Sequence, residues 1–286
     1  MAPTPIISII EPFGGSVRSH NASLPHVYFD DRAVTRGDAV VETLLLRAGT
    51  VVNIERHVDR FVASAAQLGL PEVHAHQWVA ATVEAAGEWE RRHEGVEARC
   101  TWTLSRGRES TGLATAWLVV TAVGQRPREV KVMSTTRGYR VEDTPPAWLP
   151  AGAKTINYAA TLAAVRYAQQ QGFDDVLFCD TPRGRVLEGS TSSVIVVKEG
   201  RKLRTPVRGG DIVPSTTQAA LFDAAQQAGW RCKEKRLSYN DLLEADSVWL
   251  LSSTRLAVRI RRLDDHKLPA GRLDDEFRQL VETTLG

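Results

Sequence analysis

The chain carries a pattern of strands and helices twice, once before and once after a single polar, proline-containing segment. That segment covers residues 124–129 (GQRPRE) and interrupts the apolar periodicity on both sides. Segments of this composition are typical of linkers between domains. A length of 286 residues suits two modest domains or one large one, and the interruption favours two. We therefore expect domains at residues 1–123 and 131–286, joined by a linker at residues 124–130.

The first half alternates short β-rich runs with amphipathic segments. A helix is predicted at residues 53–68, with Asn53 as its N-cap and Val62 on its apolar face. The other elements expected in this half are a helix at residues 77–92 and strands at residues 27–29, 40–47, 51–52, 99–105 and 116–122.

The second half repeats the alternation. Lys154 is expected to begin a helix that ends at Gln171, and Ser215 to open another that closes before Gly229. The remaining expected elements are strands at residues 130–134, 175–180, 185–188, 193–197, 247–251 and 257–263, and a terminal helix at residues 273–285. Strands and helices that alternate without a strict βαβ rhythm predict two α+β domains.

Composition excludes several classes of partner and compartment. Lys plus Arg number 36 against 34 for Asp plus Glu, so nothing calls for a nucleic acid or an anionic membrane. No apolar run approaches the ~20 residues of a membrane span, and the N-terminus lacks the features of a secretory signal. Cys100, Cys179 and Cys232 are odd in number and scattered. This argues against a disulfide framework and a metal cluster, and we expect a cytoplasmic protein.

Two charged residues of the second half carry the strongest chemical signal. Lys154, in the run AKTINY, can form a Schiff base with an aldehyde. Glu188 follows 34 positions later and can hold a pyridine nitrogen protonated. Most lysines are solvated surface charges, so Lys154 alone would be weak evidence. Together the two residues supply the covalent tether and the electron-sink partner of a pyridoxal 5'-phosphate (PLP) site.

A cofactor that bears a phosphate also needs cations and oriented donors. Arg60 lies inside the first predicted helix, where pairing with Asp59 or Glu55 at the surface is the alternative interpretation. Residues 215–217 (STT) open a predicted helix, whose N-terminal N–H groups and dipole favour an anion. Ordinary N-capping by one of these hydroxyls can hold at the same time. Residues 252–254 (SST) add a third hydroxyl cluster at a strand end.

Five motifs in one order carry a resemblance to a known family. They are RGDAVVET at residues 36–43, HVDR at 57–60, KTINY at 154–158, LEGSTSS at 187–193 and STTQ at 215–218. The set resembles the class IV aminotransferase family of PLP enzymes (fold type IV), which includes branched-chain aminotransferases, D-amino acid aminotransferases and 4-amino-4-deoxychorismate lyases. The resemblance implies two α+β domains with the cofactor at their interface, and a homodimer whose partner completes each site.

Within that family the chain is most similar to the aminodeoxychorismate lyases. The similar segments are GAKTINY at residues 152–158, STTQAALF at 215–222 and WLLSS at 249–253. Gln218 replaces an arginine that commonly follows the phosphate-binding threonine, and Ser215 and Ala39 replace glycines. Val41 stands where D-amino acid aminotransferases carry a tyrosine, and the loop after Arg106 lacks their Arg-x-His carboxylate trap. These departures count against transamination of D-amino acids.

The resemblance implies a role for each of several residues. The catalytic residues it implies are Lys154 and Thr43. The cofactor-binding residues it implies are Arg60, Lys154, Tyr158, Glu188, Ser192, Ser193, Thr216, Thr217 and Ser253. The substrate residues it suggests are Val41, Arg106, Arg108 and Thr254. A small molecule is the expected substrate, and no metal, nucleic acid or membrane is expected as a partner.

Three functions are consistent with these residues. The first is a 4-amino-4-deoxychorismate lyase, which releases pyruvate and the folate precursor 4-aminobenzoate, with Lys154 as tether and base. The second is an aminotransferase of branched-chain or other small amino acids, which would share every cofactor residue. The third is an idle PLP-binding or scaffold protein, which the intact Lys154, Glu188 and Arg60 disfavour.

Overall fold

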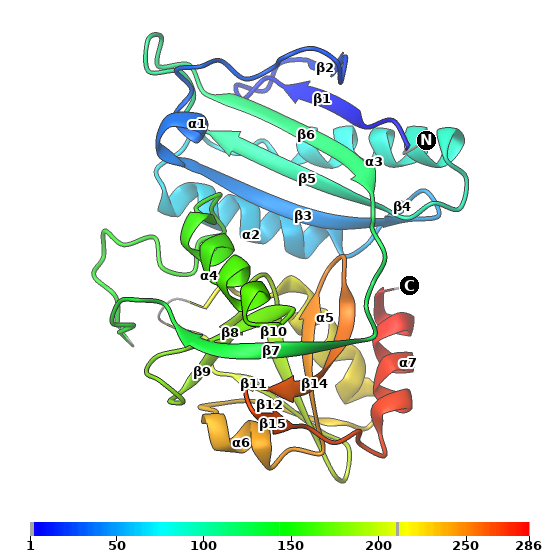
Figure 1. Cartoon of the computed structure of the whole chain (residues 1–286). Coiled ribbons are helices and arrows are strands. Elements are labelled where there is room, and N and C mark those ends of the chain that lie inside the picture. Colours follow the sequence, from blue (N-terminus) through cyan, green and yellow to red (C-terminus); the bar gives the residue numbers. More distant parts are fainter. Residues whose placement is uncertain (1–2, 143, 210–211, 286) are drawn as a thin grey trace. The chain divides into compact units, whose positions relative to one another are not determined.

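The chain separates into two compact units in a computed structural model that describes residues 3–142, 144–209 and 212–285 (Figure 1). The first unit comprises Met1–Gly124 and Ala153–Asn157, and the second comprises Gln125–Gly152 and Tyr158–Gly286. Each unit combines a sheet with helices, as an α+β fold requires. The segment that contains Lys154 packs with the first unit, although we expected the lysine in the second domain.

The first unit is built on a six-stranded sheet with the strand order β2-β1-β6-β5-β3-β4, in which all neighbours are antiparallel. Its strands are β1 (Ile6–Ile10), β2 (Val17–His20), β3 (Ala39–Arg47), β4 (Thr50–Val51), β5 (Ala98–Ser105) and β6 (Thr115–Ala122). Its helices are α1 (Arg32–Arg36), α2 (Ile54–Gln67) and α3 (Ala75–Arg92). The core between sheet and helices includes Phe61, Trp78 and Trp102, whose ring centroids lie 4.8 to 5.5 Å apart.

Several local predictions for this unit are wrong. Residues 27–29 form no strand, whereas β1 and β2 are strands that the pattern did not predict. Val62 is 40% exposed, because the buried face of α2 follows the i, i+4, i+7, i+8 spacing of His57, Phe61, Ser64 and Ala65. Asn53 does occupy the predicted N-cap position of α2, but in the left-handed conformation (φ 58°) and without a capping bond from its side chain.

The second unit contains a nine-stranded mixed sheet with the order β12-β11-β10-β13-β14-β7-β8-β9, and β15 pairs with β14. Three neighbouring pairs are parallel, namely β7 with β8, β7 with β14, and β11 with β12. The strands are β7 (Glu129–Thr136), β8 (Asp175–Cys179), β9 (Val186–Gly189), β10 (Ser193–Lys198), β11 (Lys202–Pro206), β12 (Arg231–Lys235), β13 (Ser247–Ser252), β14 (Leu256–Leu263) and β15 (His266–Lys267). The helices are α4 (Ala159–Gln170), α5 (Thr216–Gln227), α6 (Tyr239–Leu243) and α7 (Asp274–Leu285).

The element that contains Lys154 differs from its prediction. The helix expected from Lys154 begins only at Ala159, because the preceding residues are extended and bond to β3 of the first unit. Strand β7 begins at Glu129, inside the segment expected as a linker. Strands β11 and β12 were not predicted, because their charged residues hide the apolar alternation. Within the described ranges, no helix combines the length and apolar character needed to cross a membrane.

Candidate active site

Lys154 lies in a short extended segment that adds to the edge of β3. Its carbonyl oxygen accepts a hydrogen bond from Val41 N at 2.9 Å, and Ile156 N donates to Ala39 O at 3.2 Å. Lys154 N also donates to Ser64 Oγ, on α2, at 3.1 Å. The backbone of Lys154 is therefore held by both the sheet and a helix of the first unit. Such a rigid base fixes the point from which the side chain extends.

A glycine of the first motif makes room for this segment. Gly37 has a φ of +69°, and a Cβ atom built on it would lie 2.2 Å from Asn157 Oδ1. Any other residue would be strained in the left-handed backbone and would have to displace the Asn157 side chain. The RGDAVVET and KTINY motifs, which lie more than a hundred residues apart in the sequence, are thus in contact within one unit.

A buried carboxylate binds the arginine that we expected to bind phosphate. Arg60 donates from Nε to Glu42 Oε1 at 2.6 Å and from Nη2 to Glu42 Oε2 at 2.7 Å. His57 Nδ1 lies 2.7 Å from the same Oε2. Burial alone raises the pKa of Glu42, but the charge of Arg60 and the hydrogen bonds from Arg60 and His57 lower it to about 2. Glu42 is therefore ionised at neutral pH and fixes the guanidinium of Arg60.

His57 and Lys154 belong to the same cluster. Burial lowers the pKa of His57, the contact with Glu42 opposes that effect, and the positive charges of Arg60 and Lys154 add to the lowering. A neutral His57 then donates its Nδ1–H to Glu42. Glu42 is not among the site residues that the motifs implied. A signal was present, because a carboxylate in an otherwise apolar strand is expected to be buried with a cationic or hydrogen-bonding partner.

The other two predicted residues of β3 lie on its opposite face. Side chains alternate along a strand, so Val41 and Thr43 point away from the face of Glu42. Across the sheet, Val41 is opposite Thr103 and Thr43 is opposite Thr101 on β5. Arg60 and His57 thus contact Glu42 on one face of β3, whereas the Thr43 hydroxyl is on the other side of the strand.

Glu188 lies on β9 of the second unit and is mostly shielded from solvent. Arg137 donates from Nη2 to Glu188 Oε1, and Val213 N donates to Oε2 at 3.3 Å. The guanidinium of Arg137 also lies over the ring of Phe178, 4.6 Å from its centroid. Arg137 is a partner that the motifs did not identify.

Two of the predicted hydroxyl clusters meet at the start of α5. Thr217 Oγ1 and Ser253 Oγ lie 2.9 Å apart, and Thr216 and Thr217 are both buried. Ser215 caps the helix, because its Oγ accepts from Gln218 N at 3.1 Å. Ser215, a departure from the family pattern, therefore has a capping role that needs only the backbone N–H of Gln218. The helix N-terminus and the paired hydroxyls form a donor set suited to a phosphate.

The other residues predicted for the site in the second unit lie at the ends of its strands and helices, and two of them bind arginines. Ser192 Oγ accepts from Arg255, which also donates to Asp175 at 2.8 Å. The carbonyl oxygen of Thr254 accepts from Arg126 Nε at 2.6 Å. Tyr158 immediately precedes α4, and Ser193 begins β10.

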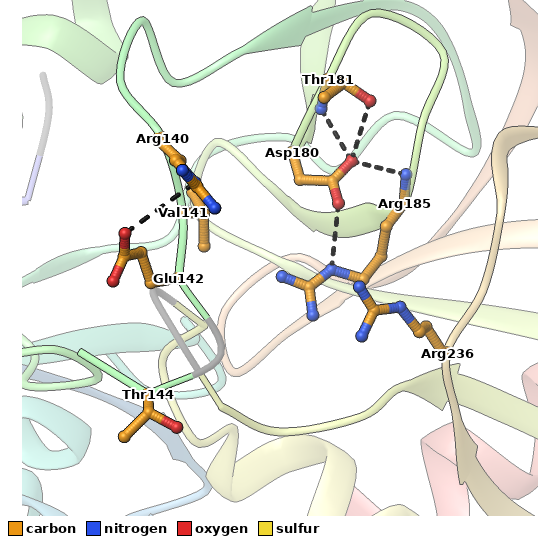
Figure 2. A pocket seen from close by; sticks show the side chains of 8 residues that line it. All are labelled: Arg140, Val141, Glu142, Thr144, Asp180, Thr181, Arg185 and Arg236. Atoms are coloured by element: carbon orange, nitrogen blue, oxygen red, sulfur yellow. Dashed lines mark hydrogen bonds and ion pairs between the residues drawn. The ribbon is translucent and has the colours of Figure 1, made fainter.

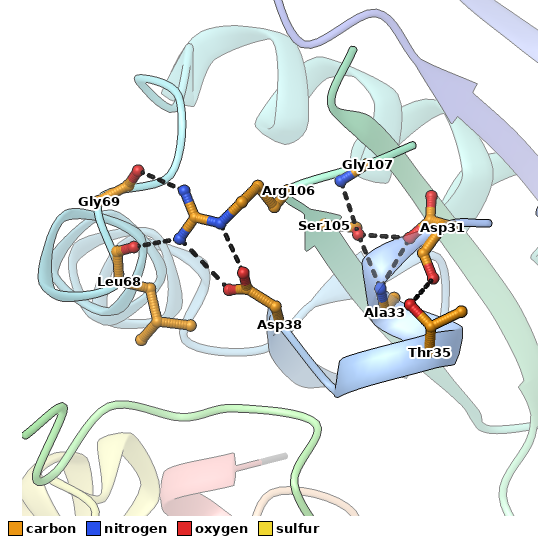
Figure 3. A network of polar contacts seen from close by, with 9 residues as sticks. All are labelled: Asp31, Ala33, Thr35, Asp38, Leu68, Gly69, Ser105, Arg106 and Gly107. Carbon is orange, nitrogen blue, oxygen red and sulfur yellow. Dashed lines mark hydrogen bonds and ion pairs between the residues drawn. The ribbon is translucent and has the colours of Figure 1, made fainter. Parts of the chain in front are cut away.

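The two loop arginines are engaged inside the first unit (Figure 3). Arg106 donates from Nε to Asp38 Oδ2 at 2.5 Å, and from Nη2 and Nη1 to the carbonyl oxygens of Leu68 and Gly69 at 2.6 and 3.1 Å. These carbonyls lie at the C-terminal end of α2, so Arg106 caps that helix. Arg108 donates to Asp30 at 2.9 Å and lies over the ring of Tyr28.

A second network in the same region holds α1 in place. Asp31 Oδ1 accepts from Ala33 N at 2.8 Å and from Ser105 Oγ at 2.5 Å (Figure 3). Ser105 Oγ in turn accepts from Gly107 N at 3.0 Å. The loop that contains Arg106 and Arg108 is therefore anchored at its first residues.

A cavity of about 440 Å³ lies in the second unit (Figure 2). Its lining residues are Arg140, Val141, Glu142, Thr144, Asp180, Thr181, Arg185 and Arg236. No predicted cofactor or substrate residue is among them. Arg185 pairs with Asp180 at 3.4 Å and Arg140 with Glu142 at 3.8 Å.

The residues present match the chemical needs of PLP. Lys154 supplies a primary amine on a fixed backbone, and Glu188 supplies a carboxylate beside a cation. Arg60 and the α5 donor set supply the positive charge and hydroxyls that a phosphate requires. The chemical groups present in each unit are therefore of the types that PLP requires.

Known proteins resemble the chain over almost its full length. The amino-transferase class IV family model matches residues 39–263. A bifunctional aminodeoxychorismate lyase / D-amino acid transaminase of Mycobacterium tuberculosis is 36% identical over 275 residues, which cover 92% of this chain and 94% of that protein. A hypothetical aminotransferase from M. tuberculosis, in its PLP-bound form, has 32% identity and a TM-score of 0.90 over 98% of each chain. A fold IV-transaminase from Curtobacterium pusillum has 33% identity and a TM-score of 0.91 over 99% of each chain.

Proposed function

Because the chain belongs to the amino-transferase class IV family, as a PLP-dependent enzyme of fold type IV, we propose that it is a 4-amino-4-deoxychorismate lyase. The reaction releases pyruvate and 4-aminobenzoate from an aminated, non-aromatic ring. Its product would serve the formation of folate. The name of the curated relative, which covers both a lyase and a transaminase activity, supports this choice.

We assign the cofactor contacts residue by residue. When bound, PLP supplies an aldehyde and a ring that accepts an electron pair. Lys154 would hold the aldehyde carbon, and Glu188 the ring nitrogen. Arg60 would bind the phosphate from the position that Glu42 fixes. The other phosphate ligands in this assignment are Thr216, Thr217 and Ser253, and the remaining cofactor contacts are Tyr158, Ser192 and Ser193.

Lys154 would also move the proton. With PLP bound, the Lys154 amine would act as the base that takes the proton from the ring carbon bearing the substrate's nitrogen. The bond between the ring carbon and the enolpyruvyl oxygen would then break with its electron pair on the oxygen. Lys154 would return the proton to the methylene carbon, which gives pyruvate and leaves an aromatic ring. Thr43 would orient the substrate. It lies on the face of β3 opposite Glu42, and therefore away from Arg60, the arginine assigned to the phosphate. Val41 and Thr254 are proposed as further substrate contacts.

The engagement of both loop arginines bears on the choice between the candidates, because it counts against a carboxylate trap built from this loop. Arg106 is bound to Asp38 and to two helix-end carbonyls, and Arg108 is bound to Asp30. Arg106 has its Nε, Nη1 and Nη2 committed to partners of the first unit, so binding a substrate carboxylate there would compete with these bonds. This disfavours a D-amino acid transaminase that relies on the loop, and it favours a structural role for both arginines.

The second candidate is a transaminase of branched-chain or other small amino acids, including D-amino acids. The second activity in the name of the curated relative and the similarity to a fold IV-transaminase support it. A transaminase needs a 2-oxo acid to return its cofactor to the aldehyde form, and it therefore shows ping-pong kinetics. A lyase ends its cycle with the aldehyde intact and needs no such acceptor.

One experiment separates the two candidates. Purified holoenzyme is given aminodeoxychorismate without any 2-oxo acid, and pyruvate and 4-aminobenzoate are measured, with Lys154→Ala as the inactive control. In parallel, D-alanine, leucine and valine are tested with 2-oxoglutarate. We expect both products in the first assay and slow exchange in the second. Fast exchange with an amino acid and no pyruvate from aminodeoxychorismate would assign the chain to the transaminases.

The family also supports a homodimer. Phe29 is 84% exposed and Leu113 is 56% exposed in the first unit, and a homodimer could cover such apolar side chains. Light scattering of the holoenzyme should therefore give twice the mass of the chain, and a monomer at micromolar concentration would exclude the dimer.

A further inference from the structure

Three adjacent strands bring a cation to the carboxylate of Glu188. Arg137 directly follows β7, β7 runs parallel to β8, and β8 pairs with β9. Thr136 is opposite Cys179 at the end of this ladder, and Glu188 lies on β9. The Arg137 side chain therefore extends across β8, with its guanidinium over the ring of Phe178, and bonds to Glu188.

The pair is well shielded and well defined. The side chains of Arg137 and Glu188 are 15% and 13% exposed. Charges at this depth interact more strongly than a surface pair, because water screens them less. The ring of Phe178 supports the guanidinium from one side. Oε1 of Glu188 is the oxygen that Arg137 binds, and Oε2 is the one that faces Val213 N at 3.3 Å.

We propose that Arg137 is a positioning residue that limits how strongly Glu188 stabilises a protonated ring nitrogen of the cofactor. This inference rests on the proposed function, in which Glu188 binds that nitrogen. Arg137 holds Oε1 and Val213 N bonds to Oε2, so the two contacts together fix the orientation of the carboxylate. Arg137 also places a positive charge close to the proton that Glu188 accepts.

The sign of the effect follows from the charges. A carboxylate alone raises the proton affinity of a nearby pyridine, and a guanidinium in contact with the carboxylate offsets part of that effect. Loss of the positive charge at Arg137 must therefore make the ring nitrogen more basic. A residue that only supported the fold would act in the other direction, because a misplaced carboxylate would hold the nitrogen less well.

The test is a titration of the resting holoenzyme, without turnover. The cofactor is labelled with ¹⁵N in its ring, and the nitrogen shift is followed against pH by NMR. In Arg137→Gln we expect the protonation midpoint to rise by roughly one pH unit or more. Arg137→Lys keeps the charge and should stay close to wild type. Arg140→Gln is the matched control, because Arg140 is exposed and follows in the same segment.

The outcomes are distinct. An unchanged or lowered midpoint in Arg137→Gln would overturn the proposal. Arg137→Met, whose apolar stem can still pack on Phe178, repeats the test if the first variant does not fold. If neither neutral variant holds the cofactor while Arg137→Lys does, Arg137 is a structural residue and the inference is wrong.

A second variant separates this inference from the proposed function. Glu188→Gln should lower the midpoint, because it removes the negative charge beside the ring nitrogen. If Glu188→Gln leaves the midpoint unchanged, the assignment of Glu188 fails and the proposed site with it. If Glu188→Gln lowers the midpoint and Arg137→Gln does not raise it, only the role of Arg137 fails.

Discussion

Glu42 and Arg60 form a two-point ion pair inside the first unit, with Nε on Oε1 at 2.6 Å and Nη2 on Oε2 at 2.7 Å. The pair joins the central part of β3 to α2, and the Glu42 side chain is fully buried. An arginine held by two bonds loses little further freedom when it binds an anion. The pair therefore links the stability of the unit to the affinity of the proposed phosphate site.

The tether can be tested by chemical fixation. Borohydride treatment of the holoenzyme should fix the cofactor to Lys154, and peptide mass spectrometry should find it there. Lys154→Ala should lose the fixed adduct and nearly all turnover, because covalent exchange and proton transfer both need its amine. Lys267→Ala, which changes an exposed lysine, should behave as wild type. A label on any other lysine would refute the assignment.

The phosphate role of Arg60 predicts a loss of cofactor affinity. In Arg60→Ala the dissociation constant of PLP should rise about tenfold or more, because charge-assisted hydrogen bonds contribute about 1.5–3 kcal/mol. The constant is measured by fluorescence titration of the apoenzyme. Arg91→Ala, an exposed position on α3 of the same unit, is the matched control. Equal effects of the two substitutions would show that Arg60 has no special part in binding.

The buried carboxylate predicts a loss of stability in acid. The pKa of Glu42 falls from 4.5 to about 2 on folding, so its contribution is complete above about pH 4.5 and is lost as the pH falls towards 2. By pH 3 the wild-type apoprotein should lose about 2 kcal/mol of its free energy of unfolding from this group alone. Urea titrations at pH 7, 5, 4 and 3 measure the loss.

Two substitutions give this measurement its controls. Glu42→Gln should be less stable at pH 7, and its free energy of unfolding should vary less between pH 5 and pH 3. Glu55→Gln changes an exposed carboxylate of α2 and should keep the wild-type slope. Parallel slopes for wild type and Glu42→Gln would mean that Glu42 is not the group responsible.

The contacts of Arg106 predict a structural effect of its replacement. Arg106→Met keeps the apolar stem but removes the bonds to Asp38 and to the end of α2, so the free energy of unfolding should fall by roughly 1–3 kcal/mol. Arg36→Met, at an exposed position, should change it by less than about 0.5 kcal/mol. A stable Arg106→Met protein with a raised KM for a carboxylate substrate would instead support the substrate role.

The sequence patterns predict regular elements well and the surroundings of the lysine poorly. Long apolar alternation identified β3, β5 and β6, and the STT start of α5 was correct with Ser215 as its cap. The helix predicted from Lys154 failed, because tertiary pairing with β3 overrides a local preference for helix. The ion partners Glu42 and Arg137 could not be predicted from spacing, because folding alone brings distant residues together.

The segment Ala153–Asn157 has a consequence for how the chain folds. It completes the edge of β3 in the first unit, yet the chain enters it from the second unit and returns to the second unit afterwards. During synthesis the first 124 residues leave the ribosome well before this segment does. The edge of β3 therefore stays unpaired until residues 153–157 have been synthesised. Unpaired strand edges are prone to pair with strands of other chains. A truncation at residue 124 should consequently aggregate more readily than the full-length protein.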